Sequence, residues 1–306
     1  MSWLQATGAI WGVASPHTAG GFRLGDGSPQ GKGSPTGEGS SSGELDSLAD
    51  GALHLWRWRL DAPGSDRDAP GSDRAEAWLT SEELARAARH RFELPRRRFV
   101  AARAGLRRIL SSYLGIDDPR KLPFVLGPHG KPALARPEQQ WLRFNLAHTA
   151  DFALCAISRE REVGIDVEGI DGARTSASAM NYAVTHFCSP AERRFLAGAL
   201  ADPGLEDEGL ADEGGPFLAL WTCKEAVGKA RGTGLVPPVP VFDAALASDL
   251  PTLPAAWQQR EEGQVWWVVR IVPFPGTVGA LAVEIPDGHA ESRSLLTWFD
   301  LRQTGT

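Results

Sequence analysis

Two charged side chains in the C-terminal half of the chain have the spacing of a phosphate-handling site. Glu225 and Lys229 are four residues apart in the stretch 217–232, which has the pattern of a helix. Residues four apart share one face of a helix, one turn from each other. A carboxylate beside an ammonium can hold a divalent cation and a phosphate together. An ordinary surface ion pair has the same spacing, so other residues must decide between the two interpretations.

A second acidic pair, Asp166 and Glu168, lies in a short apolar stretch that we expect to form a strand. Residues two apart in a strand point to the same face, so these carboxylates project side by side while their apolar neighbours face the other way. Mg²⁺ takes oxygen ligands and commonly uses one or two carboxylates together with substrate phosphates. These two residues and Glu225 would form an acidic cluster if the strand and the helix meet, with Lys229 beside it for a phosphate.

Three segments of the chain resemble the signature motifs of the 4′-phosphopantetheinyl transferase superfamily, in its surfactin-synthetase-activating type. They are 144–149 (Phe-Asn-Leu-Ala-His-Thr), 164–168 (Gly-Ile-Asp-Val-Glu) and 221–229 (Trp-Thr-Cys-Lys-Glu-Ala-Val-Gly-Lys). The turn at 130–132 and the stretch 232–235 fit the same pattern. Such enzymes move the phosphopantetheine arm of coenzyme A onto a serine of a carrier protein. The resemblance implies Mg²⁺-dependent transfer with coenzyme A as substrate, an acyl or peptidyl carrier protein as acceptor, and release of adenosine 3′,5′-bisphosphate.

The resemblance also implies a role for each candidate residue. Asp166 and Glu168 would hold Mg²⁺, and Glu225 would be either a third metal ligand or the base that takes the serine proton. Lys229 would neutralise the pyrophosphate, and Lys224 would orient its neighbours or face solvent. The residues that would bind the nucleotide end of coenzyme A are Arg97, Arg98, Lys131 and His148, with Arg98 the first choice for the 3′-phosphate.

The chain departs from the family pattern at Ala147 and Thr149, which stand where serines are usual. Loss of one hydroxyl removes a hydrogen bond worth ~1 kcal/mol. This departure leaves open a non-catalytic protein that binds coenzyme A or a carrier protein. A generic Mg²⁺-dependent nucleotide hydrolase is a further alternative, but the sequence has no phosphate-binding loop of the Gly-x-x-x-x-Gly-Lys-Ser/Thr kind.

The elements that must position these residues follow from periodicity and from helix-start signals. Strands are expected at 53–60, 141–146, 152–157, 163–167, 265–272 and 278–285. Helices are expected from Thr80 to Phe92, after Pro95 to Tyr113, from Ser189 onward, and over 217–232. A strand, helices and further strands thus follow each other twice, which predicts an α+β fold of two similar lobes.

By resemblance, the two lobes are related by a pseudo-twofold axis and the active site lies in the cleft between them. We expect a disordered leader rich in Gly, Ser and Pro over 1–51 and an N-terminal α+β lobe with the nucleotide contacts over 52–160. A C-terminal α+β lobe with the metal and catalytic residues is expected over 161–290, followed by a tail over 291–306.

Composition argues against other classes of function. Of the 306 residues, 42% are hydrophobic and 23% charged, which is typical of a globular chain with a sizeable core. The net charge of −6 argues against nucleic-acid binding, and no apolar run approaches the ~20 residues that cross a bilayer. The sequence shows no signal peptide, and its three cysteines are widely spaced. We therefore expect a cytoplasmic monomer that binds neither nucleic acid nor membrane.

Overall fold

The computed structural model describes residues 21–22, 48, 52–61, 73–149, 151–170, 177–201, 215–236, 239–242, 256–286 and 296–301. Most of the predicted leader lies outside these residues. Two parts of it are described: Gly21–Phe22 form a short strand, and Leu48 is buried in the core. Within the described part of the chain, no helix is long and apolar enough to span a bilayer.

The strands form two large sheets and one small ribbon. They are β1 (Gly21–Phe22), β2 (Leu53–Arg59), β3 (Phe124–Leu126), β4 (Pro132–Leu134), β5 (Leu142–Thr149), β6 (Phe152–Arg159), β7 (Val163–Gly169), β8 (Ala256–Glu261), β9 (Gln264–Ile271), β10 (Thr277–Ile285) and β11 (Leu296–Leu301). The first sheet has the order β1-β11-β2-β6-β5, the second has the order β7-β10-β9-β8, and β3 pairs with β4.

Helices connect and cover these sheets. The described α-helices are α2 (Asp73–Glu76), α3 (Ser81–Ala87), α4 (Glu93–Tyr113), α5 (Ala177–Phe187), α6 (Pro190–Ala201) and α7 (Gly215–Arg231). Two short 3₁₀ turns, η3 (Pro119–Lys121) and η4 (Pro137–Gln139), precede the ribbon and β5 respectively. The capping box predicted at Thr80 is present, with Glu83 accepting from the Thr80 backbone N–H and Thr80 accepting from Glu83.

The two halves of the chain repeat one strand order, which confirms the predicted α+β fold class. In the first half, β2 pairs antiparallel with β6, which pairs antiparallel with β5. In the second half, β7 pairs antiparallel with β10, which pairs antiparallel with β9. In each half, the last of the three strands (β6 or β10) therefore lies in the middle, between the first strand and the second. We call these halves the first and second lobes.

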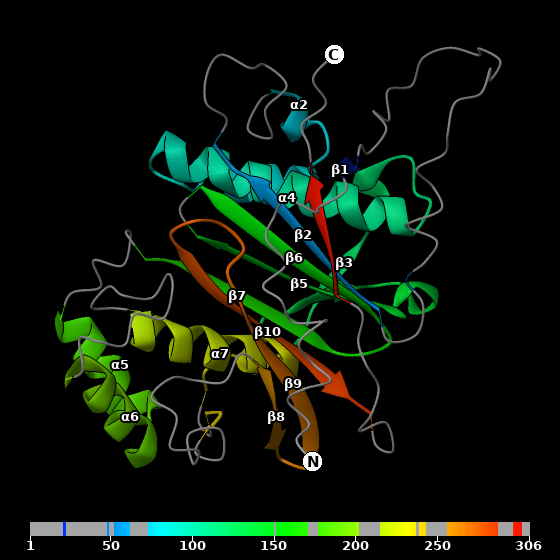
Figure 1. The fold of residues 1–306 in the computed structure, drawn as a ribbon. Coiled ribbons are helices and arrows are strands. Elements are labelled where there is room, and N and C mark those ends of the chain that lie inside the picture. Colours follow the sequence, from blue (N-terminus) through cyan, green and yellow to red (C-terminus); the bar gives the residue numbers. More distant parts are fainter. Residues whose placement is uncertain are drawn as a thin grey trace, which may run out of the picture.

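The layers follow from where each sheet buries its apolar face (Figure 1). Helix α4 packs on the outer face of the first sheet, where Leu106 and Ile109 join the core around Trp56. Helix α7 packs on the outer face of the second sheet, where Val227 lies in the core around Trp266. A third apolar cluster joins the inner faces of the two sheets. The lobes therefore share a core in addition to their own.

Three features differ from the sequence-based expectation. The helix predicted to run to Phe92 ends at Ala87, and α4 begins at Glu93, so that Pro95 lies in its first turn, where a missing N–H is tolerated. The prediction has no counterpart for strands β1, β3, β4 and β8 or for helices α2 and α5. The segment predicted as a tail contains β11, which pairs parallel with β2 in the first sheet.

Strand β7 and helix α7 approach each other at Gly164 more closely than a side chain would allow. A Cβ added to Gly164 would lie 2.1 Å from the Ala226 carbonyl oxygen and 2.3 Å from the Ala230 nitrogen. Since both neighbours are backbone atoms in a helix, they cannot move aside independently. This contact fixes the distance between the strand that carries Asp166 and the helix that carries Lys229.

We predict that Gly164→Ala destabilises the protein by ~3 kcal/mol, the upper end of the usual cost of overpacking, because the helix backbone atoms cannot move away from an added Cβ. The matched control is Gly198→Ala, since Gly198 lies exposed in α6 and an added Cβ would meet nothing within 4 Å. That change should be neutral or stabilise by ~0.5–1 kcal/mol through helix propensity. Urea unfolding of the three proteins measures both effects. Equal stability of Gly164→Ala and wild type would contradict the close approach.

Candidate active site

Strand β7 and helix α7 meet, which is the condition that the predicted acidic cluster depends on. Asp166 in β7 is 5% exposed, and its Oδ1 accepts a hydrogen bond from Lys229 Nζ of α7 at 2.5 Å. Alternation in β7 points Asp166 away from the inner core, where Ile165 and Val167 are buried. Helical spacing then brings Glu225 to the same side of α7 as Lys229.

The carboxyl groups of Asp166 and Glu168 on β7 and of Glu225 on α7 influence one another, and each has a raised pKa. Burial raises the pKa of Asp166, although the Lys229 ammonium opposes the shift. For Glu168, burial and then the charge of Asp166 raise the pKa to about 7, with Glu225 adding to it. Burial also raises the pKa of Glu225, where Lys229 opposes and Asp166 adds. Asp166 and Glu225 thus both disfavour the charged form of Glu168, and a divalent cation would relieve that repulsion.

One oxygen of the cluster lacks a partner among the described residues. Asp166 Oδ2 is buried and accepts no hydrogen bond, while Oδ1 is taken by Lys229. Over the described ranges, no three His, Cys, Asp or Glu side chains are already arranged as a metal cage. Mg²⁺ does not need such a cage, because it retains waters and takes substrate oxygens beside one or two carboxylates. The free buried oxygen and the two neighbouring carboxyls therefore fit a Mg²⁺ ion.

The first lobe contributes two basic side chains to the same region. His148 lies at the end of β5, and its pKa is lowered by partial burial and then by the charges of Lys229 and Arg98. Asp166 acts on His148 in the opposite direction. These effects place the imidazole of the first lobe within electrostatic range of the ammonium and the carboxylate of the second. The arrangement suits a ligand with several negative charges.

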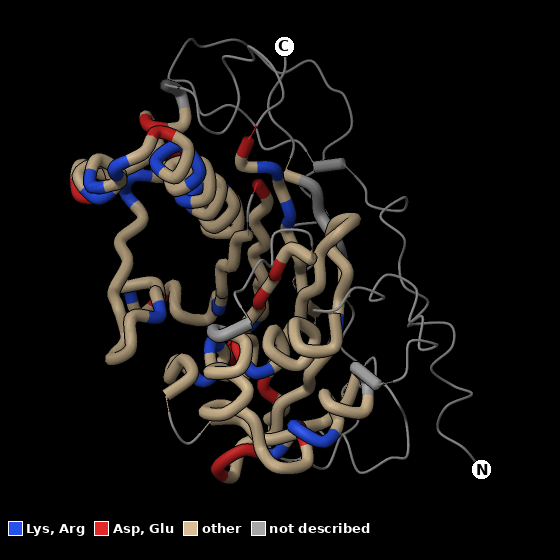
Figure 2. The backbone as a smooth tube through the Cα atoms, turned by 90° about the vertical axis from the view of Figure 1, so that its left-hand side faces the viewer, with Lys and Arg blue, Asp and Glu red and all other residues tan. Residues whose placement is uncertain are grey.

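Arg98 is held by a carboxylate of its own lobe. Its Nε and Nη2 donate to Oδ2 of Asp61 at 3.0 and 2.6 Å, while Asp61 Oδ1 is buried without a hydrogen-bond partner in the described structure. Arg97 is half-buried beside it on α4. Figure 2 shows the basic residues gathered on this helix, at the upper left. An anion arriving at Arg98 would share or displace the Asp61 contact.

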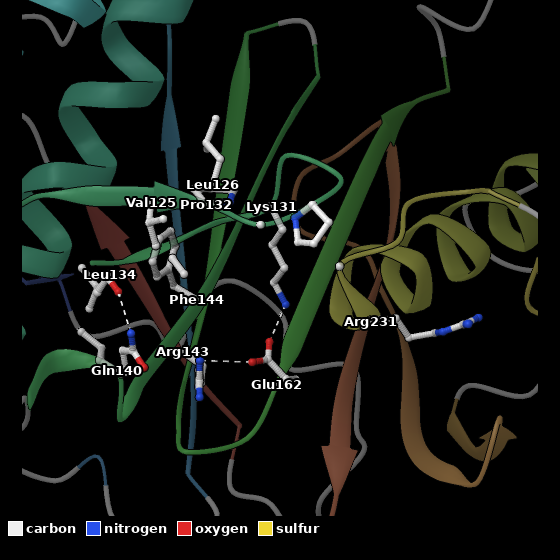
Figure 3. Close-up of a pocket in the computed structure, with 15 residues that line it drawn as sticks. Val125, Leu126, Lys131, Pro132, Leu134, Gln140, Arg143, Phe144, Glu162 and Arg231 are labelled. Atoms are coloured by element: carbon white, nitrogen blue, oxygen red, sulfur yellow. Dashed lines mark hydrogen bonds and ion pairs between the residues drawn. The ribbon is translucent and has the colours of Figure 1, made fainter. Parts of the chain in front are cut away.

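Lys131, predicted as a contact to the nucleotide end, lies beside the start of β7 and the end of α7. Its ammonium lies at the start of β7 and donates to Glu162 and to two backbone carbonyls. Counted from Val163, Asp166 lies three residues and Glu168 five residues further along the strand, roughly 10 and 17 Å away at ~3.3 Å per residue. Lys131 instead lines a cavity of about 420 Å³ beside the turn between β3 and β4 (Figure 3). None of the carboxyl groups of the cluster lines that cavity.

Lys224 faces the protein interior, which corrects the alternative of a solvent-facing side chain. It is 0% exposed and pairs with Glu192 Oε1 at 2.8 Å, and its ammonium also donates to the Pro240 carbonyl. Glu192 in turn accepts from the backbone N–H of Phe242 at 2.9 Å. The sequence identified Glu192 as a helix-capping residue, and its Oε2 does accept from the Ser189 N–H. Its second role as counter-ion of Lys224 had no sequence signal.

The comparisons with known proteins agree on one family. A family model described as the 4′-phosphopantetheinyl transferase superfamily matches residues 162–268. The 4′-phosphopantetheinyl transferase HetI of Nostoc sp. is 37% identical over 238 residues, which cover 78% of this chain and 90% of HetI. A phosphopantetheinyl transferase of Thraustochytrium sp. is 29% identical, covering 58% of this chain and 61% of its own. The 4′-phosphopantetheinyl transferase AcpT of Escherichia coli is 36% identical, covering 45% and 60% respectively.

The buried pair of Glu192 and Lys224 yields a stability prediction. Lys224→Met leaves a buried carboxylate without its counter-ion and should cost ~3–5 kcal/mol of unfolding free energy. The double variant Glu192→Gln, Lys224→Met removes both charges and should cost less than the single variant, because no unpaired charge stays buried. Guanidinium unfolding of both variants and of wild type measures this. A double variant less stable than Lys224→Met would contradict direct pairing.

Proposed function

The chain belongs to the 4′-phosphopantetheinyl transferase superfamily, and on that premise we propose the reaction and its residues. The protein transfers the phosphopantetheine arm of coenzyme A to a serine of an apo acyl or peptidyl carrier protein, with Mg²⁺, and releases adenosine 3′,5′-bisphosphate. One observation carries the proposal. Asp166, with a free buried oxygen and with Lys229 bonded to the other, lies beside two further carboxyls and opposite the basic groups of the first lobe.

Asp166, Glu168 and Glu225 would hold the Mg²⁺ ion. When bound, the ion would neutralise charge on the pyrophosphate of coenzyme A and so make the departing phosphate a better leaving group. Three carboxyls with raised pKa values support this role, because clustered acidic groups at one site are costly unless a cation accompanies them.

The chain's own residues would do the rest by position and charge. Lys229, which donates to Asp166, would turn part of its hydrogen bonding to a pyrophosphate oxygen. Glu225 would act as third metal ligand or as the base for the serine proton; its raised pKa makes it a stronger proton acceptor than an exposed glutamate. The phosphorus–oxygen bond to the nucleotide would break as the serine oxygen bonds to the same phosphorus.

The nucleotide end would lie against the first lobe. Arg98 and His148 would meet the 3′-phosphate and the neighbouring phosphates, since the charges of Arg98 and of Lys229 both act on the His148 imidazole. Arg97 stays a predicted contact on the same helix. Lys131 also stays a predicted nucleotide contact. Because its ammonium already donates three hydrogen bonds within the protein, such a contact would come from its aliphatic stem or its backbone.

The departure at Ala147 has a structural setting that leaves catalysis possible. Ala147 is 4% exposed and packs in the core between the two sheets, away from the carboxyl cluster. Replacing a serine there would therefore not remove a group from Asp166 or Lys229.

The test of the reaction is the mass of the acceptor. The protein is incubated with coenzyme A, Mg²⁺ and each of several apo carrier proteins, and every carrier is weighed by mass spectrometry. We expect a gain equal to one phosphopantetheine arm on at least one carrier. Nucleotide release with no carrier gain would support a hydrolase instead, and neither product would support a binding protein.

The metal role of Asp166 predicts a large loss of turnover with an intact fold. Asp166→Asn keeps the side-chain shape but removes the charge, so Mg²⁺-dependent turnover should fall about 100-fold or more. The control Asp117→Asn alters an exposed carboxylate of the first lobe and should be silent. Initial rates and melting curves are compared for both variants. Wild-type turnover in Asp166→Asn would remove this residue from the site.

The proposed 3′-phosphate contact predicts a change in substrate binding. Arg98→Ala should raise KM for coenzyme A tenfold or more, since a charged hydrogen bond of ~1.5–3 kcal/mol is lost while the reacting groups are untouched. Dephospho-coenzyme A lacks the 3′-phosphate and should bind wild type and variant alike. Arg89→Ala is the control, because Arg89 is an exposed arginine of the same lobe. A variant that keeps the wild-type preference between the two substrates would exclude Arg98.

A further inference from the structure

The ammonium of Lys131 is fully used by protein acceptors. It donates to Glu162 Oε2 at 2.6 Å, to the Val163 carbonyl at 3.1 Å and to the Ala230 carbonyl at 2.8 Å. A lysine ammonium has three protons and no acceptor capacity. Three convergent acceptors therefore leave no proton for a phosphate, and the side chain is only 17% exposed.

The three acceptors belong to the two elements that carry the reacting groups. Val163 is the first residue of β7, three residues before Asp166, and Glu162 directly precedes the strand. Ala230 lies in the last turn of α7, directly after Lys229. Carbonyls in the last turn of a helix have no partner within the helix and attract cations. Lys131 itself comes from the turn between β3 and β4 of the first lobe.

We call the place where Lys131 meets the start of β7 and the end of α7 the junction. The stem of Lys131 and the other partners of Glu162 add contacts on either side of it. Helix α7 ends at Arg231. The next residue, Gly232, has a φ of +74°, and a Cβ there would lie 3.4 Å from Lys131 Cδ. Glu162 Oε1 is 3.3 Å from Arg143 Nη1 of β5, and the Glu162 carbonyl accepts from the Glu284 N–H. Figure 3 shows Lys131 reaching down to Glu162, with Arg143 on the other side of that carboxylate.

We propose that Lys131 is a positioning residue: its ammonium joins the first lobe to the start of β7 and the end of α7, and so sets Asp166 and Lys229 relative to Arg98 and His148. The proposal rests on the proposed transferase reaction for its kinetic consequence, but the junction itself does not. A substrate ligand and a positioning residue differ in effect. Loss of a ligand weakens binding, whereas misalignment of reacting groups lowers the rate of the bound complex.

The test uses Lys131→Met in the full chain, which keeps the apolar stem and removes the ammonium. The matched control is Lys121→Met, because Lys121 is an exposed lysine of the same lobe. We expect kcat to fall about tenfold or more in Lys131→Met while KM for coenzyme A stays within about twofold of wild type. A tenfold rise in KM, with or without a fall in kcat, would overturn the proposal in favour of direct nucleotide contact. Unchanged kcat and KM would overturn it as well.

Hydrogen–deuterium exchange tests the junction independently of any reaction. In Lys131→Met, peptides over 163–167 and 226–231 should exchange faster than in Lys121→Met, because the strand start and the helix end lose their shared anchor. Unchanged exchange there would overturn the proposal even if the protein is a transferase. If no carrier protein is modified by wild type, the exchange result alone decides about the junction.

Glu162→Gln is the milder second variant in case Lys131→Met folds poorly. It leaves both carbonyl acceptors and an amide oxygen in place but removes the opposite charge. We expect the same direction of change in kcat and in exchange, with a smaller size. A change in KM for coenzyme A without a change in kcat would count against the positioning role.

Discussion

The close backbone contact of β7 with α7 is the constraint on which the site depends. Only a glycine at position 164 allows the Ala226 carbonyl and the Ala230 amide to come so near, and the contact holds Asp166 and Lys229 at bonding distance. Each element is stabilised by its own burial: β7 in the core between the sheets and α7 in the outer core. The charged groups are thus placed by apolar packing and not by their mutual attraction, which could not by itself offset their desolvation.

That placement also explains how like charges come to lie together. Burial raises the pKa values of Asp166, Glu168 and Glu225, and their mutual repulsion adds to the cost. A single ammonium, Lys229, offsets part of it. Functional sites commonly hold such unfavourable charge arrangements, because a ligand or ion of opposite charge then binds with a larger gain. On the first lobe, Arg98 carries a permanent positive charge that acts on the neighbouring His148.

Much of this could be predicted from the sequence because it is local. Alternation put Asp166 and Glu168 on one face of a strand, helical spacing paired Glu225 with Lys229, and the order of elements indicated two similar lobes. What could not be predicted depends on tertiary contacts between distant segments. The burial of Lys224 against Glu192, the pairing of Arg98 with Asp61, and the three acceptors around Lys131 each join residues with no shared local pattern. Strand β11 escaped prediction for a similar reason, since its pairing with β2 spans nearly the whole chain.

The position of a bound metal ion tests most directly whether Asp166 is the centre of the site. Crystals of the protein with coenzyme A and Mn²⁺, which prefers the same oxygen ligands as Mg²⁺, would give an anomalous difference map that shows the metal alone. We expect one peak within coordination distance of Asp166, with the pyrophosphate of coenzyme A as a further ligand and Lys229 beside it. A metal peak at another place in the fold, or coenzyme A bound with its pyrophosphate away from Asp166, would contradict the account.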